Sequence, residues 1–206
     1  MAGDDAALMT LVRAIVADDA TAASTLLEGS PELAIAQAKE GATRQAAKEY
    51  FLVEIEQYLY AGDTALHIAA AAHRPRIIRL LLAAGADVGA TNRRGAQPLH
   101  YAADSAPGSR TWDPDAQAAV VAYLVEAGAD PNALDKNGST PLHRAIRNRC
   151  ASAVRALLAG GADARLPNKK GSTPLQLATW TTGRGGSGSP EAKAQQEEIV
   201  QLLAMT

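Results

Sequence analysis

The cysteine and the histidines carry the side chains with the widest reactive chemistry in this sequence. Cys150 follows His143 by seven residues, and a thiol beside an imidazole base is the arrangement used in nucleophilic catalysis. Seven helical residues place the two backbones about 10 Å apart, which is too far for direct proton transfer. The remaining histidines, His67, His73 and His100, are scattered, so no cluster has metal-ligand spacing. We expect a free, partly buried thiol, no metal and no cofactor.

Three carboxylates that lie close together in the sequence are candidates for acid–base chemistry. Asp104, Asp113 and Asp115 fall within or beside one segment, but no catalytic motif surrounds them. Asp113-Pro114 is also a typical helix start. The glycine-rich run 183–188 resembles a phosphate-binding loop, yet no strand precedes it and no Gly-Lys-Ser motif follows it. We therefore expect a solvated loop and a flexible connector rather than an enzyme active site.

The overall charge and hydropathy exclude several classes of partner. The formal net charge is −2, without the basic excess that phosphate backbones attract, so we expect no nucleic acid. No apolar run is long enough to cross a bilayer, and the N-terminus lacks a signal-peptide pattern, so we expect no membrane. One cysteine forms no internal disulfide. These features predict a cytoplasmic protein. Residues 1–61 nevertheless hold 10 acidic and only 4 basic side chains.

A four-residue motif recurs along the chain at a regular spacing. It reads Thr64–His67, Gln97–His100, Thr140–His143 and Thr173–Gln176, and its leucines are 33, 43 and 33 residues apart. A Gly-Ala-Asp marker at 85, 128 and 161 keeps the same steps. Two markers in phase predict a repeat protein with a 33-residue unit and one ten-residue insertion.

The chemistry of one unit predicts two helices and a turn. Thr140 is suited to cap the first free amides of a helix, and Pro141 lacks the amide that would go unbonded at the first helical position. Leu142 begins an apolar stripe at helical spacing. A second helix is expected over 151–159, ended by glycines, and the segment 163–171 should return the chain to the next cap.

These motifs resemble the ankyrin repeat, whose Gly-x-Thr-Pro-Leu-His pattern with a late Leu-Leu-x-x-Gly-Ala is matched between Gly62 and Asp163. The resemblance implies an all-α solenoid of stacked helix pairs with finger-like hairpin turns. It also implies that the motif histidines form hydrogen bonds within and between units. Ala65, Gln97 and Gln176 depart from the pattern, so we expect weaker capping in their units.

We therefore expect the chain to form one ankyrin-repeat domain over 1–206, with irregular ends and three insertions. A helical stripe that includes Tyr50, Ile55 and Tyr58 predicts an inserted amphipathic helix near Thr43 to Tyr60. The expected segments are a divergent N-terminal helix pair (1–29), the inserted helix (30–61), a repeat (62–94), a repeat with a loop inserted near 104–116 (95–137), a repeat (138–170), and a capping repeat with the glycine-rich loop (171–206).

The resemblance implies a protein-interaction module that binds through its concave face and finger tips. We expect the partner to be another protein with an acidic surface, since the finger tips are basic. The alternative is a small-molecule site or an unorthodox enzyme, with a pocket formed by the inserted helix, the inserted loops and the groove. The candidate partner-binding residues are Arg93, Arg94, Tyr101, Asp104, Trp112, Lys136, Arg144, Arg147, Asn148 and Trp180.

Overall fold

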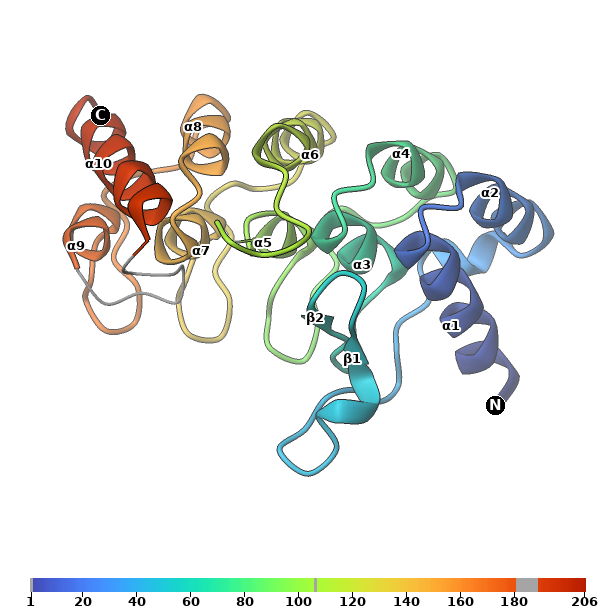
Figure 1. Cartoon of the computed structure of the whole chain (residues 1–206). Coiled ribbons are helices and arrows are strands. Elements are labelled where there is room, and N and C mark those ends of the chain that lie inside the picture. The colour runs from blue at the N-terminus through green and yellow to red at the C-terminus, as the bar shows by residue number, and fades with distance from the viewer. Residues whose placement is uncertain (1, 106, 181–188) are drawn as a thin grey trace. The chain divides into compact units, whose positions relative to one another are not determined.

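The computed structural model describes residues 2–105, 107–180 and 189–206 (Figure 1). Their regular secondary structure is helical apart from one short strand pair. Their contacts divide the chain into two compact units, Met1–Pro98 and Leu99–Thr206. The expectation of a single domain over 1–206 stays a prediction. No helix in the described ranges is long and apolar enough to span a membrane.

Unit 1 is built from two stacked helix pairs. The first pair is α1 (Ala2–Val16) and α2 (Ala20–Gly29), which matches the predicted N-terminal pair. The second is α3 (Ala65–Ala71) and α4 (Pro75–Ala83). α1 packs against α3 and α2 packs against α4, so each helix of one pair meets its counterpart in the other. The apolar seam between them is fully buried and includes Leu11, Ile15, Leu66, Ile77 and Leu81.

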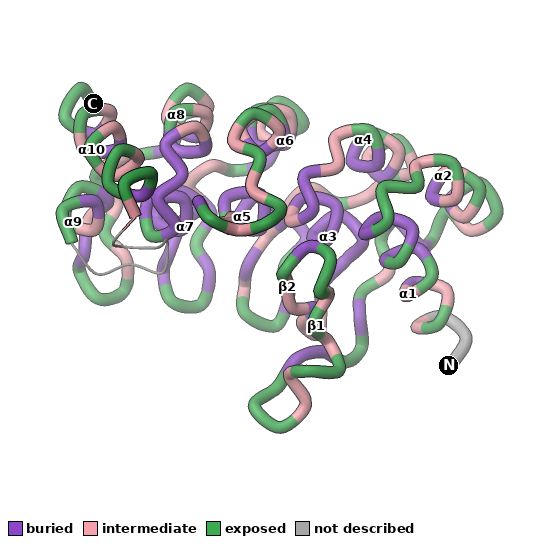
Figure 2. The backbone as a smooth tube through the Cα atoms, in the orientation of Figure 1, coloured by how far each residue is buried: buried purple, intermediate pink, exposed green. Residues whose placement is uncertain are grey.

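Unit 2 continues with the same alternation of helices. It contains α5 (Pro98–Ala102, beginning at the unit boundary), α6 (Pro114–Glu126), α7 (Pro141–Asn148), α8 (Ala151–Ala159), α9 (Pro174–Thr179) and α10 (Pro190–Ala204). In Figure 1, α5, α7 and α9 form one row, and α6, α8 and α10 form another. α8 packs against α6, α7 and α10, so neighbouring pairs share one core. Figure 2 shows the buried positions gathered where the helices face one another. The arrangement is an all-α repeat solenoid.

The predicted inserted helix over 30–61 is wrong. This part of unit 1 holds two 3₁₀ turns, η1 (Pro31–Ala34) and η2 (Lys48–Tyr50), and a hairpin of β1 (Phe51–Leu52) and β2 (Gln57–Tyr58). The strands are antiparallel, with Phe51 opposite Tyr58. Aromatic residues, which favour strands, occupy the paired positions Phe51 and Tyr58, and residues 53–56 form the turn between the strands.

Of the other two predicted insertions, the structure describes the one near 104–116. The first is an irregular loop between α5 and α6, which ends when Asp113 caps α6 through the amides of Asp115 and Ala116. Residues 181–188 of the glycine-rich insertion lie outside the described residues. After them, α10 begins at Pro190 with Ser189 as its cap.

Candidate functional site

Three finger turns share one hydrogen-bond pattern. A side-chain oxygen of Asn92, Asp135 or Asn168 accepts from the backbone N–H two residues later, at 2.8, 2.8 and 2.9 Å, and from the N–H four residues later, at 3.1, 3.0 and 3.2 Å. A glycine with positive φ then closes each turn. Two positions lie between the Asn or Asp and the glycine. Their side chains are exposed and take no part in the hydrogen bonds that close the turn. These positions hold Arg93 and Arg94, Lys136 and Asn137, and Lys169 and Lys170.

The motif histidines join each helix to the following finger. His67 accepts the Thr64 N–H at Nδ1 (3.1 Å), so the ring proton is on Nε2, which donates to the Ala96 carbonyl (3.0 Å). His143 repeats this with Thr140 (3.2 Å) and the Ser172 carbonyl (3.3 Å), and His100 Nε2 reaches the Ser139 carbonyl (3.0 Å). The expected structural role of the motif histidines is confirmed.

The last motif shows how glutamine substitutes for this histidine. Gln176 Oε1 accepts the Thr173 N–H at 2.9 Å, and Thr173 in turn accepts the Gln176 N–H. The reciprocal cap is therefore kept in α9, contrary to the weaker capping we expected there. Thr64 also keeps this cap, although Ala65 replaces proline.

In unit 1, the basic finger residues lie beside aromatic side chains of the insertion. The guanidinium carbons of Arg93 and Arg94 lie 5.5 and 4.8 Å from the centroid of the Tyr60 ring. Arg93 also donates to the Ala42 carbonyl. Tyr60 in turn neighbours Tyr58 (centroids 6.3 Å apart), which packs on Phe51 (4.8 Å).

Sequence reasoning missed Phe51, Tyr58 and Tyr60 as surface residues, because this stretch was interpreted as an amphipathic helix. A signal that reveals them is the two-residue spacing of Tyr58 and Tyr60. Phe51 is 37% exposed, and the two tyrosines are half-buried. We define the aromatic–arginine cluster as Phe51, Tyr58, Tyr60, Arg93 and Arg94.

In unit 2, three candidate residues that we expected on an exposed face are buried instead. Tyr101 is 3% exposed, and Arg144 and Asn148 are each 8% exposed. The loop after α5 brings Asp104 over α7, where its carboxylate accepts from Arg144 Nη1 (3.3 Å) and Asn148 Nδ2 (2.5 Å). Arg144 Nη2 also donates to Asp135 (3.1 Å). These contacts hold the inserted loop and a finger turn to α7, the first helix of the next repeat.

The electrostatics of this network are fixed by hydrogen bonds. Burial alone would raise the pKa of Asp135, but hydrogen bonds from the Ser139 and Asn137 amides and from Arg144 lower it below the ordinary value. Asp135 is therefore ionised at neutral pH and neutralises the buried Arg144. A buried arginine held in this way is not available to a partner, and removing one of its carboxylates would leave an uncompensated buried charge.

Cys150 and Trp112 meet beneath the same loop. Cys150 is fully buried and its thiol faces the Ser105 carbonyl. Burial raises its pKa to about 12, although Gln117 and Trp112 lie against the sulfur and oppose this shift. The thiol is free, as expected, and its protonated state rules out a thiolate nucleophile at neutral pH. Trp112 itself is half-buried.

The remaining predicted residues of unit 2 are exposed. Lys136 and Arg147 are on the surface, and Trp180 is 52% exposed where it caps α9. Lys169 Nζ donates to the Lys136 carbonyl (2.6 Å), and this hydrogen bond joins the third finger turn to the second. Leu134, which precedes the second finger turn, is 58% exposed and was not predicted. Within the described ranges, no group of three or more His, Cys, Asp or Glu is placed to hold a metal ion.

Comparison with known proteins agrees with this geometry. A family model for ankyrin repeats in many copies matches residues 52–102 and 124–178, and a single ankyrin-repeat model matches residues 94–136. A search of curated proteins gave no match. The family models, the capped helix pairs and the histidine bridges agree, so the chain belongs to the ankyrin-repeat family.

Proposed function

We propose that this chain binds another protein with an acidic surface, through its exposed finger turns. Ankyrin repeats are generally protein–protein interaction modules. The contact residues proposed on unit 2 are Lys136, Lys169 and Lys170. Leu134 and Trp180 are exposed apolar residues of the same unit and are proposed as further contacts. On unit 1 they are the members of the aromatic–arginine cluster.

The observation that supports this proposal is the recurrence of a basic side chain directly after the Asn or Asp of each turn. Arg93, Lys136 and Lys169 occupy this position, and all three are exposed. The turn itself is closed by the Asn or Asp oxygen and by glycine, so closure of the turn does not require a cation there. Arg93 and Lys169 also donate to the Ala42 and Lys136 carbonyls. Exposed cations with several aromatic neighbours are the composition typical of protein interfaces.

The alternative of a small-molecule or catalytic site around the inserted loop has less support. Asp104, its proposed acid, already accepts hydrogen bonds from Arg144 and Asn148. Cys150 is protonated and buried beneath that loop. The groups that would act on a substrate are thus engaged by the chain itself.

Site-specific crosslinking tests the proposed surface of unit 2. A photoreactive residue at Asn137, on an exposed turn, should capture the partner from a lysate, whereas one at Lys193 on α10 should not. With the captured partner purified, we expect the triple variant K136E/K169E/K170E to raise Kd about ten- to hundredfold, because three favourable charge contacts become repulsive. Titration calorimetry at low salt measures this change.

The matched control is K193E, which reverses an exposed lysine of α10 and should change Kd less than about twofold. Binding should also weaken as salt is raised, since exposed charges are screened. An unchanged Kd for the triple variant, with the thermal melt of the wild type, would refute the finger-turn surface.

A further inference from the structure

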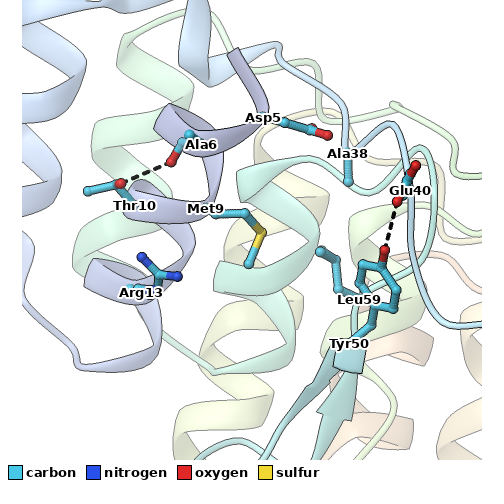
Figure 3. A pocket seen from close by; sticks show the side chains of 9 residues that line it. All are labelled: Asp5, Ala6, Met9, Thr10, Arg13, Ala38, Glu40, Tyr50 and Leu59. Carbon is cyan, nitrogen blue, oxygen red and sulfur yellow. Dashed lines mark hydrogen bonds between the residues drawn. The ribbon is translucent and has the colours of Figure 1, made fainter. Parts of the chain in front are cut away.

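Unit 1 contains a pocket that the finger-turn surface does not use. It has a volume of about 380 Å³ and lies between α1 and the insertion that precedes α3 (Figure 3). Volumes of roughly 300–1,000 Å³ are typical of ligand pockets, so this one is large enough for a single side chain or a small molecule. α1 contributes Asp5, Met9 and Arg13 to its lining, and the insertion contributes Glu40 and Tyr50.

The lining is apolar at its base and acidic at one end. Ala38 and Leu59 are 5% and 2% exposed, and the half-buried Met9 extends from α1 toward them in Figure 3. The half-buried Asp5 projects from α1 and the exposed Glu40 from the insertion, and these two carboxylates form the acidic end. Arg13 lies two helical turns from Asp5, at about 12 Å along the helix axis.

The two carboxylates accept hydrogen bonds from the chain itself. Asp5 Oδ1 accepts the Lys39 backbone N–H at 3.4 Å, and Glu40 Oε2 accepts the Tyr50 hydroxyl at 2.9 Å. Neither carboxylate forms a salt bridge with a described lysine or arginine. The hydrogen bond to Glu40, burial, and the charges of Glu40, Glu49 and Asp5 all raise the pKa of Tyr50, which reflects a negative potential at this end.

The wall that carries Glu40 is held rigidly by the backbone. Ala42 N–H donates to the Leu59 carbonyl (2.8 Å), and Gly62 N–H donates to the Ala38 carbonyl (2.7 Å). At Gly41 the two backbones approach so closely that a Cβ atom would lie 2.4 Å from the Ala61 nitrogen. A binding site built on a fixed wall loses little entropy when it is occupied.

We infer that this pocket binds a lysine or arginine side chain of a partner polypeptide. The apolar stem would lie along Met9 and Leu59, and the cationic head would lie between Asp5 and Glu40. The acidic end repels phosphates and carboxylates. Arg13, at the other end, disfavours ligands with two cationic groups. The pocket thus selects a single cation on a flexible apolar chain.

The methionine methyl groups provide a direct readout in the full chain. Met9 lines the pocket, whereas Met205 is 86% exposed on the last turn after α10 and serves as an internal reference. With ¹³C-methyl methionine, N-acetyl-lysine-N-methylamide should shift the Met9 resonance saturably, with a Kd on the order of 1 mM for so small a ligand. The Met205 resonance should not move. N-acetyl-norleucine-N-methylamide, which keeps the stem but lacks the charge, should bind at least tenfold more weakly.

Charge-neutralising variants separate binding from folding. D5N and E40Q keep the hydrogen-bond acceptors, so each should leave the thermal melt unchanged and weaken lysine binding about three- to tenfold. The matched control E54Q, which removes an exposed charge in the turn between β1 and β2, outside the lining, should change lysine binding less than about twofold. Equal binding of the lysine and norleucine compounds, or no saturable Met9 shift, would overturn the inference. Neither result depends on the lysines of the finger turns, so the two proposals fail independently.

Discussion

At the scale of single residues, burial decides what each basic side chain does. Arg144 and Arg147 lie one helical turn apart on α7, yet Arg144 is 8% exposed and held by Asp104 and Asp135, whereas Arg147 is on the surface. Removing a buried charge leaves its partners unpaired, and removing an exposed one does not. Arg147 therefore remains a candidate contact with a partner protein, while Arg144 belongs to the folded framework.

His143 gives a prediction of pH dependence. Burial is the largest cause that lowers its pKa, with the Arg147 charge acting in the same direction, while the Ser172 hydrogen bond and Asp135 oppose it. The unfolded state therefore takes up the proton at a higher pH than the folded state. Its contribution to stability is complete above about pH 6.5 and is lost as pH falls through the folded pKa.

The variant H143Q tests this, because Gln176 shows that glutamine keeps the cap. At pH 8 we expect the free energy of unfolding to fall by about 1–3 kcal/mol, since the Ser172 carbonyl loses its buried donor. This deficit should shrink between pH 8 and pH 5, because only the wild type has His143 to protonate. Urea unfolding across this range measures it. R147Q is the control, and should keep the wild-type stability at pH 8. A deficit that stays constant with pH would contradict the assignment.

At the scale of elements, the insertion before α3 is shaped by backbone contact rather than by an amphipathic stripe. Residues 37–42 run beside 59–64, joined by hydrogen bonds of Ala38, Ala42 and Gly62 and by the bridge between Gln37 and Thr64. This pairing turns the following chain into the β1–β2 hairpin and places Tyr60 beside Arg93 and Arg94.

Gly41 should be essential to this pairing. G41A places a methyl group 2.4 to 2.6 Å from backbone atoms of Tyr60 and Ala61, so we expect a loss of about 1–3 kcal/mol from overpacking. Hydrogen exchange should show faster exchange at Ala38, Ala42 and Gly62, with α6 to α8 unchanged. G29A, at the last residue of α2 with nothing within 4 Å, is the matched control. It should leave stability equal or up to about 1 kcal/mol higher. Unchanged exchange in G41A would show that the close approach is not needed.

At the scale of the whole molecule, each repeat is stabilised mainly by its neighbours, as in other solenoids. In unit 2, Leu142 on α7 is fully buried, because α7 packs against both α8 and α9. Leu175 occupies the same motif position on α9, which packs against α7 and α10, and it is 42% exposed. The leucine at this motif position is therefore buried in one repeat and partly exposed in the next.

This difference gives a prediction about stability. L142A should lower the free energy of unfolding by about 2–5 kcal/mol, as expected for a buried leucine, because a cavity remains between repeats. L175A should lower it by less than about 1 kcal/mol, since much of its surface already contacts water. Denaturant unfolding of the two variants provides the comparison. Equal losses would mean that Leu175 is covered in solution, for example by a partner.

The sequence by itself determined the repeat, its phase and the helix starts, and its resemblance to ankyrin repeats implied the hydrogen bonds of the motif histidines. These features depend on short-range chemistry that recurs every 33 residues, so each copy supports the interpretation of the others. The tertiary structure alone decided which of Arg144 and Arg147 is exposed, the hairpin before α3 and the pocket beside α1. Such features appear once and depend on contacts between distant segments, as between Asp104 and Arg144, 40 residues apart. No local spacing records the path that brings those segments together.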